Sequence, residues 1–298
     1  MQAAGYPRRI SLAKALARKL SDALLARRRA LEAGIAWATV HPGRRPGLTL
    51  DHLEVAPTLY VAADNDHPAL LTVREALAAS LPVARSGTLA ALADYRAERP
   101  AGLIASDAYG QPAEEAIDAA DDRDHVSLPV PFTRFLYYLG RDLRPDRVVE
   151  LGTAHGVSSL HLLAALHDNA KGHLTTIEFD HDRRALAVEG FRRFYPDSER
   201  VSSVQGLFAE VLPDLMPSVA PVDLVFEDGP HTADVTLSAF LAVVDHIRPG
   251  GLYLVDDIRD NPGQEVAWAK IRSDPRIAAS IEVNGRMGIC VRASATIS

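Results

Sequence analysis

From about residue 147 the chain alternates short runs of β-branched and apolar residues with longer stretches of helical periodicity. This alternation constrains the fold more than any other feature of the sequence, because it is typical of βαβ units that build a parallel sheet. We therefore expect five parallel strands, near residues 147–151, 173–179, 201–205, 222–228 and 251–257.

Two further runs, 277–283 and 287–292, flank the dipeptide Asn284-Gly285. Asn and Gly both tolerate positive φ, so this dipeptide favours a two-residue hairpin turn. The predicted fold is α/β: a Rossmann-like, doubly wound, seven-stranded sheet with an antiparallel C-terminal hairpin, preceded by a mainly helical N-terminal region.

Composition excludes several classes of protein. The 298 residues include 32 Lys and Arg against 39 Asp and Glu, a net charge of −7, which argues against a nucleic-acid partner. Cys290 is the single cysteine, so an intrachain disulfide, a Cys-rich zinc site and a CxxC motif are excluded. No apolar run approaches the roughly 20 residues of a transmembrane helix, and the first residues lack the apolar core of a secretory signal. We expect a soluble, cytoplasmic protein.

The N-terminal segment has the opposite charge balance. Residues 1–50 contain ten Arg or Lys and only Asp22 and Glu32 as acids, and leucines between Leu12 and Leu24 recur at helical spacing. We predict a basic amphipathic helical extension that packs on the main domain or on a dimer partner. Binding to a membrane surface or an acidic partner, and an organellar targeting peptide, are the alternatives.

The chain divides into this extension (1–50), a helical lid or oligomerisation region (51–125) and the α/β domain (126–298). Asp66 ahead of Pro68 predicts a helix that runs through Leu70 to Leu81. Seven carboxylates between residues 107 and 124 predict a solvated loop or helix face.

The first predicted strand leads into Gly152-Thr153-Ala154-His155-Gly156, and Val157-Ser158 then opens a helix. Glycines at such a turn let the backbone approach a ligand closely, and the helix N-terminus offers N–H groups to an anion. A dinucleotide fingerprint would need a second glycine where Ala154 stands.

The spacing ExGxxxG from Glu150 to Gly156 resembles motif I of class I S-adenosylmethionine-dependent methyltransferases. Glu178, at the end of the second strand, matches the acid that binds the ribose hydroxyls in that family; the alternative is that Glu178 caps the next helix. Leu207 departs from the acidic or polar residue usual after strand three. The resemblance implies S-adenosyl-L-methionine as cofactor, held by Glu150, Gly152, Thr153, Gly156, Ser158, Glu178, Phe179, Gly206, Phe208 and Asp228.

Three carboxylates follow the next two strands. Asp228 ends the fourth strand, and Asp256 and Asp257 end the fifth, so all three are expected to converge at one edge of the sheet. Clustered carboxylates repel one another unless a cation intervenes, and oxygen ligands suit Mg²⁺. The alternative is that Asp256 and Asp257 only cap the following helix.

These positions resemble the ligand positions of metal-dependent O-methyltransferases of the catechol, caffeoyl and macrocin types. The resemblance implies Mg²⁺ bound by Asp228, Asp256 and Asp257. It also implies catalytic roles for Asp228 and for His231, which replaces the usual lysine base three residues after the first ligand; a histidine can take a hydroxyl proton near neutral pH. The alternative for His231 is a surface residue at a helix start.

The sequence thus predicts an O-methyltransferase, Mg²⁺-assisted, that methylates a hydroxyl of a small metabolite or glycoside and forms homo-oligomers through its N-terminal helices. Two other functions stay open: a metal-independent N-methyltransferase, and a non-catalytic scaffold that binds S-adenosylmethionine.

Overall fold

The structure is a computed structural model that describes residues 67–80, 87–97, 128 and 130–294. The predicted extension 1–50 and the acid-rich segment 107–124 lie outside the described residues. Leu81, where the helix predicted from Leu70 was expected to end, also lies outside the described residues. Within the described ranges, no helix has the length and apolar character needed to cross a bilayer.

Seven strands form one sheet in the order β3-β2-β1-β4-β5-β7-β6, which confirms the predicted fold class. The first five strands pair in parallel, and β7 runs antiparallel to both β5 and β6. The strands are β1 Arg147–Leu151, β2 His173–Glu178, β3 Val201–Gln205, β4 Val222–Glu227, β5 Ile247–Val255, β6 Ile277–Val283 and β7 Met287–Arg292.

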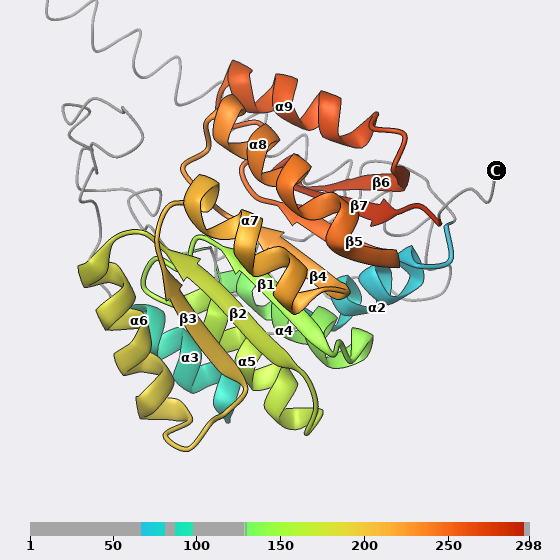
Figure 1. The fold of residues 1–298 in the computed structure, drawn as a ribbon. Coiled ribbons are helices and arrows are strands. Elements are labelled where there is room, and N and C mark those ends of the chain that lie inside the picture. Colours follow the sequence, from blue (N-terminus) through green and yellow to red (C-terminus); the bar gives the residue numbers. More distant parts are fainter. Residues whose placement is uncertain (1–66, 81–86, 98–127, 129, 295–298) are drawn as a thin grey trace, which may run out of the picture. The chain divides into compact units, whose positions relative to one another are not determined.

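Helices cover both faces of this sheet, as Figure 1 shows: α7, α8 and α9 lie on one face, and α4 and α5 lie on the other. The helices are α2 Leu70–Ser80, α3 Thr88–Ala97, α4 Val130–Leu143, α5 Val157–Asp168, α6 His181–Phe194, α7 Phe208–Val219, α8 Ala233–Val243 and α9 Pro262–Arg272, with a 3₁₀ turn, η3, at Val244–His246.

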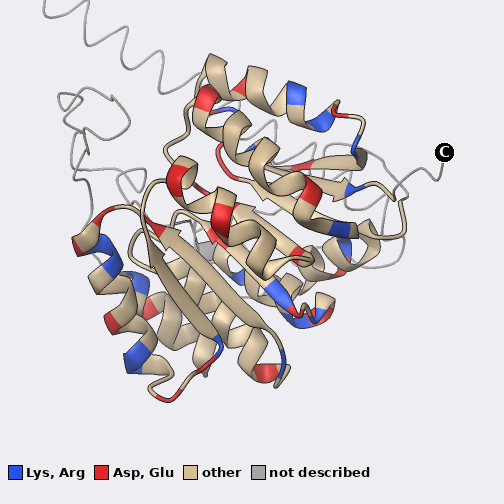
Figure 2. Cartoon of the chain, in the orientation of Figure 1, with Lys and Arg blue, Asp and Glu red and all other residues tan. Residues whose placement is uncertain are grey.

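Because both faces are covered, the middles of the strands carry no charge. All six residues of β4 are buried. Charged residues occupy only the first two or last two positions of any strand, and Figure 2 shows the remaining charges on the helices and loops. This pattern is the one expected of a buried parallel sheet, and it places the polar chemistry at the strand ends.

Strand β5 begins earlier than predicted, at Ile247 instead of residue 251, and ends at Val255. Pro249-Gly250-Gly251 lies inside it. The pairing register with β4 shifts between Val222 and Leu224, and Gly250 has a φ of +75°, so an irregularity accommodates the proline. Asp256 and Asp257 directly follow the strand.

Helices α2 and α3 pack against the α/β domain. The Arg134 guanidinium of α4 donates from Nε to the Ser80 carbonyl at the end of α2 (3.0 Å). Tyr95 of α3 is buried, and its hydroxyl donates to the His155 carbonyl in the glycine turn (3.1 Å). A segment some 60 residues away in sequence therefore supports that turn.

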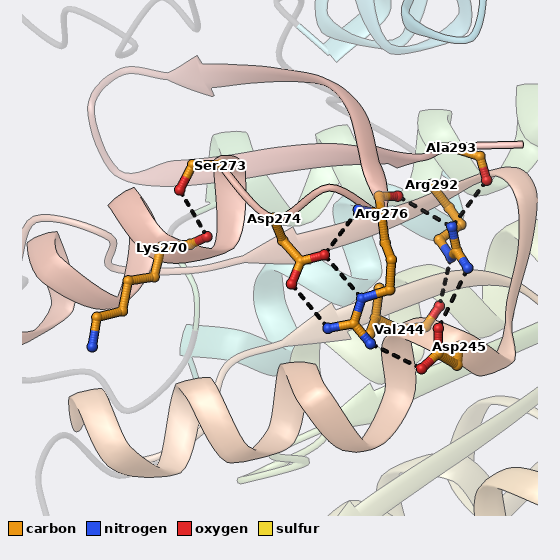
Figure 3. A network of polar contacts seen from close by, with 8 residues as sticks. All are labelled: Val244, Asp245, Lys270, Ser273, Asp274, Arg276, Arg292 and Ala293. Carbon is orange, nitrogen blue, oxygen red and sulfur yellow. Dashed lines mark hydrogen bonds and ion pairs between the residues drawn. The ribbon is translucent and has the colours of Figure 1, made fainter. Parts of the chain in front are cut away.

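Ion pairs fasten the C-terminal hairpin at the amino-end edge of the sheet (Figure 3). Arg276 pairs through Nη1 with Asp245 (2.8 Å) and through Nε with Asp274 (2.9 Å). Arg292 donates from Nε to the Val244 carbonyl (2.9 Å). Because β6 and β7 are antiparallel, fixing them here leaves their turn at the opposite edge, where β1, β2, β4 and β5 end.

The hairpin turn contains three residues, so the predicted two-residue turn is wrong. Asn284 and Gly285 do adopt positive φ, +54° and +65°, as predicted. The Arg286 N–H donates to the Val283 carbonyl (3.0 Å), and Val283 pairs with Met287. Arg286 is the extra residue.

We expect Gly288→Ala to lower the free energy of unfolding by about 1–3 kcal/mol, the usual range for overpacking a core. A Cβ at Gly288 would lie 2.5 Å from the Trp268 ring. Urea denaturation measures the effect. In a Trp268→Leu background the same substitution should have a much smaller effect, and an equal effect in both backgrounds would contradict this origin.

Candidate functional site

The carboxyl ends of four strands meet at one edge because their pairing continues past the strands. The N–H of Gly152 donates to the Ile177 carbonyl (3.0 Å), that of Asp228 to Leu151 (2.9 Å) and that of Asp256 to Glu227 (2.9 Å). The predicted convergence of the glycine turn with the strand-end carboxylates is therefore present.

The glycine turn requires Gly152. Its φ is +99°, and a Cβ there would lie 2.1 Å from the Asp228 carbonyl oxygen. Gly156, with φ +76°, precedes α5, and no side chain caps that helix. The first N–H groups of α5 thus point toward the strand-end edge without a side-chain acceptor, as the predicted anion site needs.

Glu178 lies at the end of β2 and holds the turn. Its carboxylate accepts the Ala154 N–H (2.7 Å) and the Asp180 N–H (3.0 Å), and burial raises its pKa. Asp180 is the residue that caps α6, accepting from the N–H groups of Asp182 and Arg183 (2.9 Å each). The helix-capping alternative for Glu178 is therefore wrong.

Glu150 forms the centre of a buried polar network behind the turn. Its Oε2 accepts from the hydroxyls of Thr176 (2.6 Å) and Ser159, and the Thr176 and Thr153 hydroxyls lie 2.5 Å apart. Among the described residues, Oε1 has no hydrogen-bond partner. Burial raises the pKa of Glu150 to about 7. Sequence reasoning did not identify Thr176.

The other predicted cofactor residues lie around this turn. Ser158 is buried at the start of α5, Phe179 follows β2, and the Gly206 N–H donates to the Glu178 carbonyl (3.1 Å). Phe208 belongs to the hydrophobic core, and its ring packs so close to Gly229 that a Cβ added to this glycine would lie 2.8 Å from it. Their contacts with a cofactor stay predictions.

The three predicted carboxylates come together with Arg286, which sequence reasoning missed. The Arg286 guanidinium binds Asp256 through Nε (2.9 Å) and Nη2 (2.6 Å), and Nη2 also reaches Asp257 (3.2 Å). Asp256 is fully buried, whereas the Arg286 side chain is 32% exposed.

His231 lies between Asp228 and Asp257. The alternative interpretation, a surface residue at the start of a helix, is therefore not supported. Its Nε2 is 3.5 Å from Asp228 Oδ1 and 3.5 Å from Asp257 Oδ2. A φ of +50° and a bond from the Asn261 side chain to its carbonyl (3.0 Å) fix its backbone. We call Asp228, His231, Asp256, Asp257 and Arg286 the strand-end cluster.

Burial and mutual repulsion dominate the electrostatics of the cluster. Burial, with repulsion from Asp256 and Asp257, raises the pKa of Asp228 well above its ordinary value. Burial, with repulsion from Asp256, raises that of Asp257 to about 6. Burial opposes the charge of Arg286, but Asp256 and the other carboxylates raise its pKa above the ordinary value.

The arrangement does not fit the predicted Mg²⁺ site. No group of three or more His, Cys, Asp or Glu side chains within the described ranges is placed to hold a metal ion. Arg286 engages both oxygens of Asp256, and His231 lies between Asp228 and Asp257. The helix-capping alternative for Asp256 and Asp257 is also wrong, because Asn261 caps α9.

A cavity of about 650 Å³ lies at the other edge of the sheet, between the amino ends of β1, β2 and β4. Arg147, His173, Asp223 and Arg248 line it, and Asp223 pairs with Arg248. Ligands of open α/β sheets bind at the carboxyl ends of the strands, so we do not assign this cavity to the site.

Comparisons with known proteins find methyltransferases. A family described as a methyltransferase domain matches residues 149–258. A putative O-methyltransferase of Mycobacterium sp. (strain JLS) is 31% identical over 174 residues, 56% of this chain and 76% of that protein. An O-methyltransferase of Aspergillus hancockii is 29% identical over 52% of this chain. This match spans 59% of the length of that relative.

The fold also matches solved structures. The O-methyltransferase TomG from Streptomyces achromogenes, solved with S-adenosylmethionine, aligns with a TM-score of 0.52 and 21% identity, over 72% of this chain and 94% of that one. At this identity the likeness concerns the fold.

Glu150→Gln should remove a pH dependence of stability. With a pKa of about 7 in the folded protein against an ordinary 4.5, Glu150 keeps a proton that the unfolded chain has released. The free energy of unfolding of the wild type should therefore fall relative to the variant as pH rises from about 4.5 to 7, by at most about 1.4 kcal/mol per pH unit. Urea denaturation across this range measures the difference, and a constant difference would show that the pKa of Glu150 is the same in the folded and the unfolded protein.

Proposed function

The chain belongs to the class I S-adenosylmethionine-dependent O-methyltransferases, and we propose that it transfers a methyl group to a hydroxyl of a small metabolite or glycoside. One observation carries the proposal: three features share one edge of the sheet. They are the glycine turn, Glu178, which is the proposed ligand of the ribose hydroxyls, and the strand-end cluster. The O-methyltransferase relatives support the choice of oxygen as the acceptor atom.

The residues around the turn fit the proposed cofactor. Glu178 accepts one N–H on each oxygen, which leaves a lone pair on each for a ribose hydroxyl. Oε1 of Glu150, which has no hydrogen-bond partner in the described part of the chain, suits a donor such as an ammonium group. Bound S-adenosylmethionine would supply an electrophilic methyl group, whose bond to sulfur breaks, leaving the electron pair on sulfur, as the acceptor oxygen bonds to the carbon.

His231 is the proposed base. Its Nε2 lies 3.5 Å from Asp228 Oδ1 and 3.5 Å from Asp257 Oδ2, so both carboxylates flank the atom that is proposed to take the proton. Nε2 would take the proton of the acceptor hydroxyl. Asp228 would act through His231 and through its backbone contact with the glycine turn.

The predicted Mg²⁺ is not part of the mechanism that we propose. Convergence of the three carboxylates supports an ion, but the nitrogen groups of Arg286 and His231 already lie against them. The metal hypothesis has a direct test: chelation should lower turnover if the ion is required.

An assay of methyl transfer also tests the two alternative functions. Transfer to an amine but not to a hydroxyl would favour the N-methyltransferase alternative, and cofactor binding without turnover on either class would favour the scaffold. Formation of S-adenosylhomocysteine with phenolic, sugar-hydroxyl and amine acceptors separates the three functions.

Glu178→Ala should weaken binding of S-adenosylhomocysteine by roughly 10–100-fold, because hydrogen bonds to a charged group are lost. Titration calorimetry measures the affinity. Glu189→Ala, at an exposed position of α6, is the matched control and should bind normally. Wild-type affinity in a folded Glu178→Ala protein would remove this residue from the site.

His231→Ala should lower kcat by roughly 10²–10⁴-fold, the usual contribution of a general base, while S-adenosylhomocysteine affinity stays near that of the wild type. Steady-state kinetics with the active acceptor tests this. His181→Ala, on the exposed start of α6, serves as the control. A kcat within twofold of the wild type would exclude His231 as the base.

A further inference from the structure

We infer that Arg286 is the fixed cation of the strand-end cluster and stands in the position that the sequence assigned to Mg²⁺. The inference rests on the proposed function only for the role of the cluster in methyl transfer. Its structural part, a guanidinium in place of a divalent ion, follows from the contacts of Arg286.

The hairpin turn delivers Arg286 to the cluster. The Arg286 carbonyl accepts the Ile258 N–H (2.9 Å), which joins the turn to the segment after β5. Its guanidinium carbon lies 5.6 Å from the centre of the Phe132 ring of α4. The bond to Ile258 thus fixes the backbone of Arg286, and Phe132 and Asp256 contact its guanidinium, so the charge is part of the folded structure.

Two of the three predicted ligands of the ion, Asp256 and Asp257, already accept hydrogen bonds from Arg286. Mg²⁺ needs oxygens at about 2.0–2.1 Å with near-octahedral geometry. Both oxygens of Asp256 accept hydrogen bonds from Arg286, and a dication beside that guanidinium would meet a like charge. Asp256 and Asp257 accept hydrogen bonds from Arg286, and His231 Nε2 lies 3.5 Å from Asp228 and from Asp257.

Arg286 can also do part of what an ion would do for the reaction. Its charge offsets the carboxylates, which would otherwise repel an acceptor oxygen as it becomes negative. Among the described residues, Arg286 donates hydrogen bonds from Nε and Nη2 only, so Nη1 is the group that would donate to the acceptor oxygen in this mechanism. Methyl transfer would then need no divalent cation.

The experiment compares Mn²⁺ binding by the wild type, Arg286→Gln and Arg286→Lys, followed by electron paramagnetic resonance of free Mn²⁺, with the Tm of each protein with and without Mg²⁺. Arg259→Gln is the matched control, because Arg259 lies near the same turn but pairs with Glu282 (2.6 Å). Arg286→Gln combined with Asp256→Asn tests whether any new binding uses this carboxylate.

We expect the wild type, Arg286→Lys and Arg259→Gln to bind no Mn²⁺ at millimolar concentration and to show no Tm change with Mg²⁺. Arg286→Gln should lose roughly 5–15 °C in Tm, because it leaves the buried Asp256 unpaired. It should gain Mn²⁺ binding, recover part of the lost Tm with Mg²⁺, and lose both responses when Asp256→Asn is added.

Stoichiometric Mn²⁺ binding by the wild type would overturn the inference, even if Arg286→Gln failed to fold. A folded Arg286→Gln protein that gains no Mn²⁺ binding would also overturn it. Failure of the proposed function is distinguishable, because it would appear as absence of S-adenosylhomocysteine binding in calorimetry, whatever the Mn²⁺ result.

Discussion

Parallel pairing of β2, β1, β4 and β5 is the constraint on which the rest of the site depends. Because these strands run in one direction, the residues that follow them must share one edge, and the backbone bonds of Gly152, Asp228 and Asp256 extend the pairing beyond the strands. This geometry brings the glycine turn next to the carboxylates, and it also forces like charges together. Some group must then compensate the charge.

The antiparallel hairpin supplies that group. Its amino-edge end is fastened by Arg276 and Arg292, and its turn places Arg286 against Asp256, which is fully buried. A buried carboxylate without a partner is strongly destabilising, whereas a bidentate guanidinium satisfies both of its oxygens. Stability of this edge and the electrostatics of the proposed reaction therefore depend on the same ion pair.

The sequence predicted the fold well because its signals are local. Hydrophobic runs located six strands to within a residue, and the spacing of Gly152, Glu178 and Asp228 placed the predicted site at one edge. The start of β5 was missed because an irregular register, which depends on pairing with β4, absorbs Pro249.

What the sequence did not predict depends on contacts between distant segments. Nothing near Arg286 in sequence indicates that it meets Asp256, 30 residues earlier. The Tyr95 hydroxyl similarly donates to the His155 carbonyl from α3, a helix that lies before the predicted α/β domain of residues 126–298. The two-residue turn expected at Asn284-Gly285 would have removed Arg286 from the turn, so a single extra residue decides where the cation lies.

A crystal structure of the protein with S-adenosylhomocysteine, grown in Mn²⁺ and examined by anomalous scattering, tests the central claim most directly. We predict the ribose of the ligand on Glu178, the Arg286 guanidinium still paired with Asp256, and no anomalous peak among Asp228, Asp256 and Asp257. A Mn²⁺ peak bound by these carboxylates, with Arg286 displaced, would contradict it.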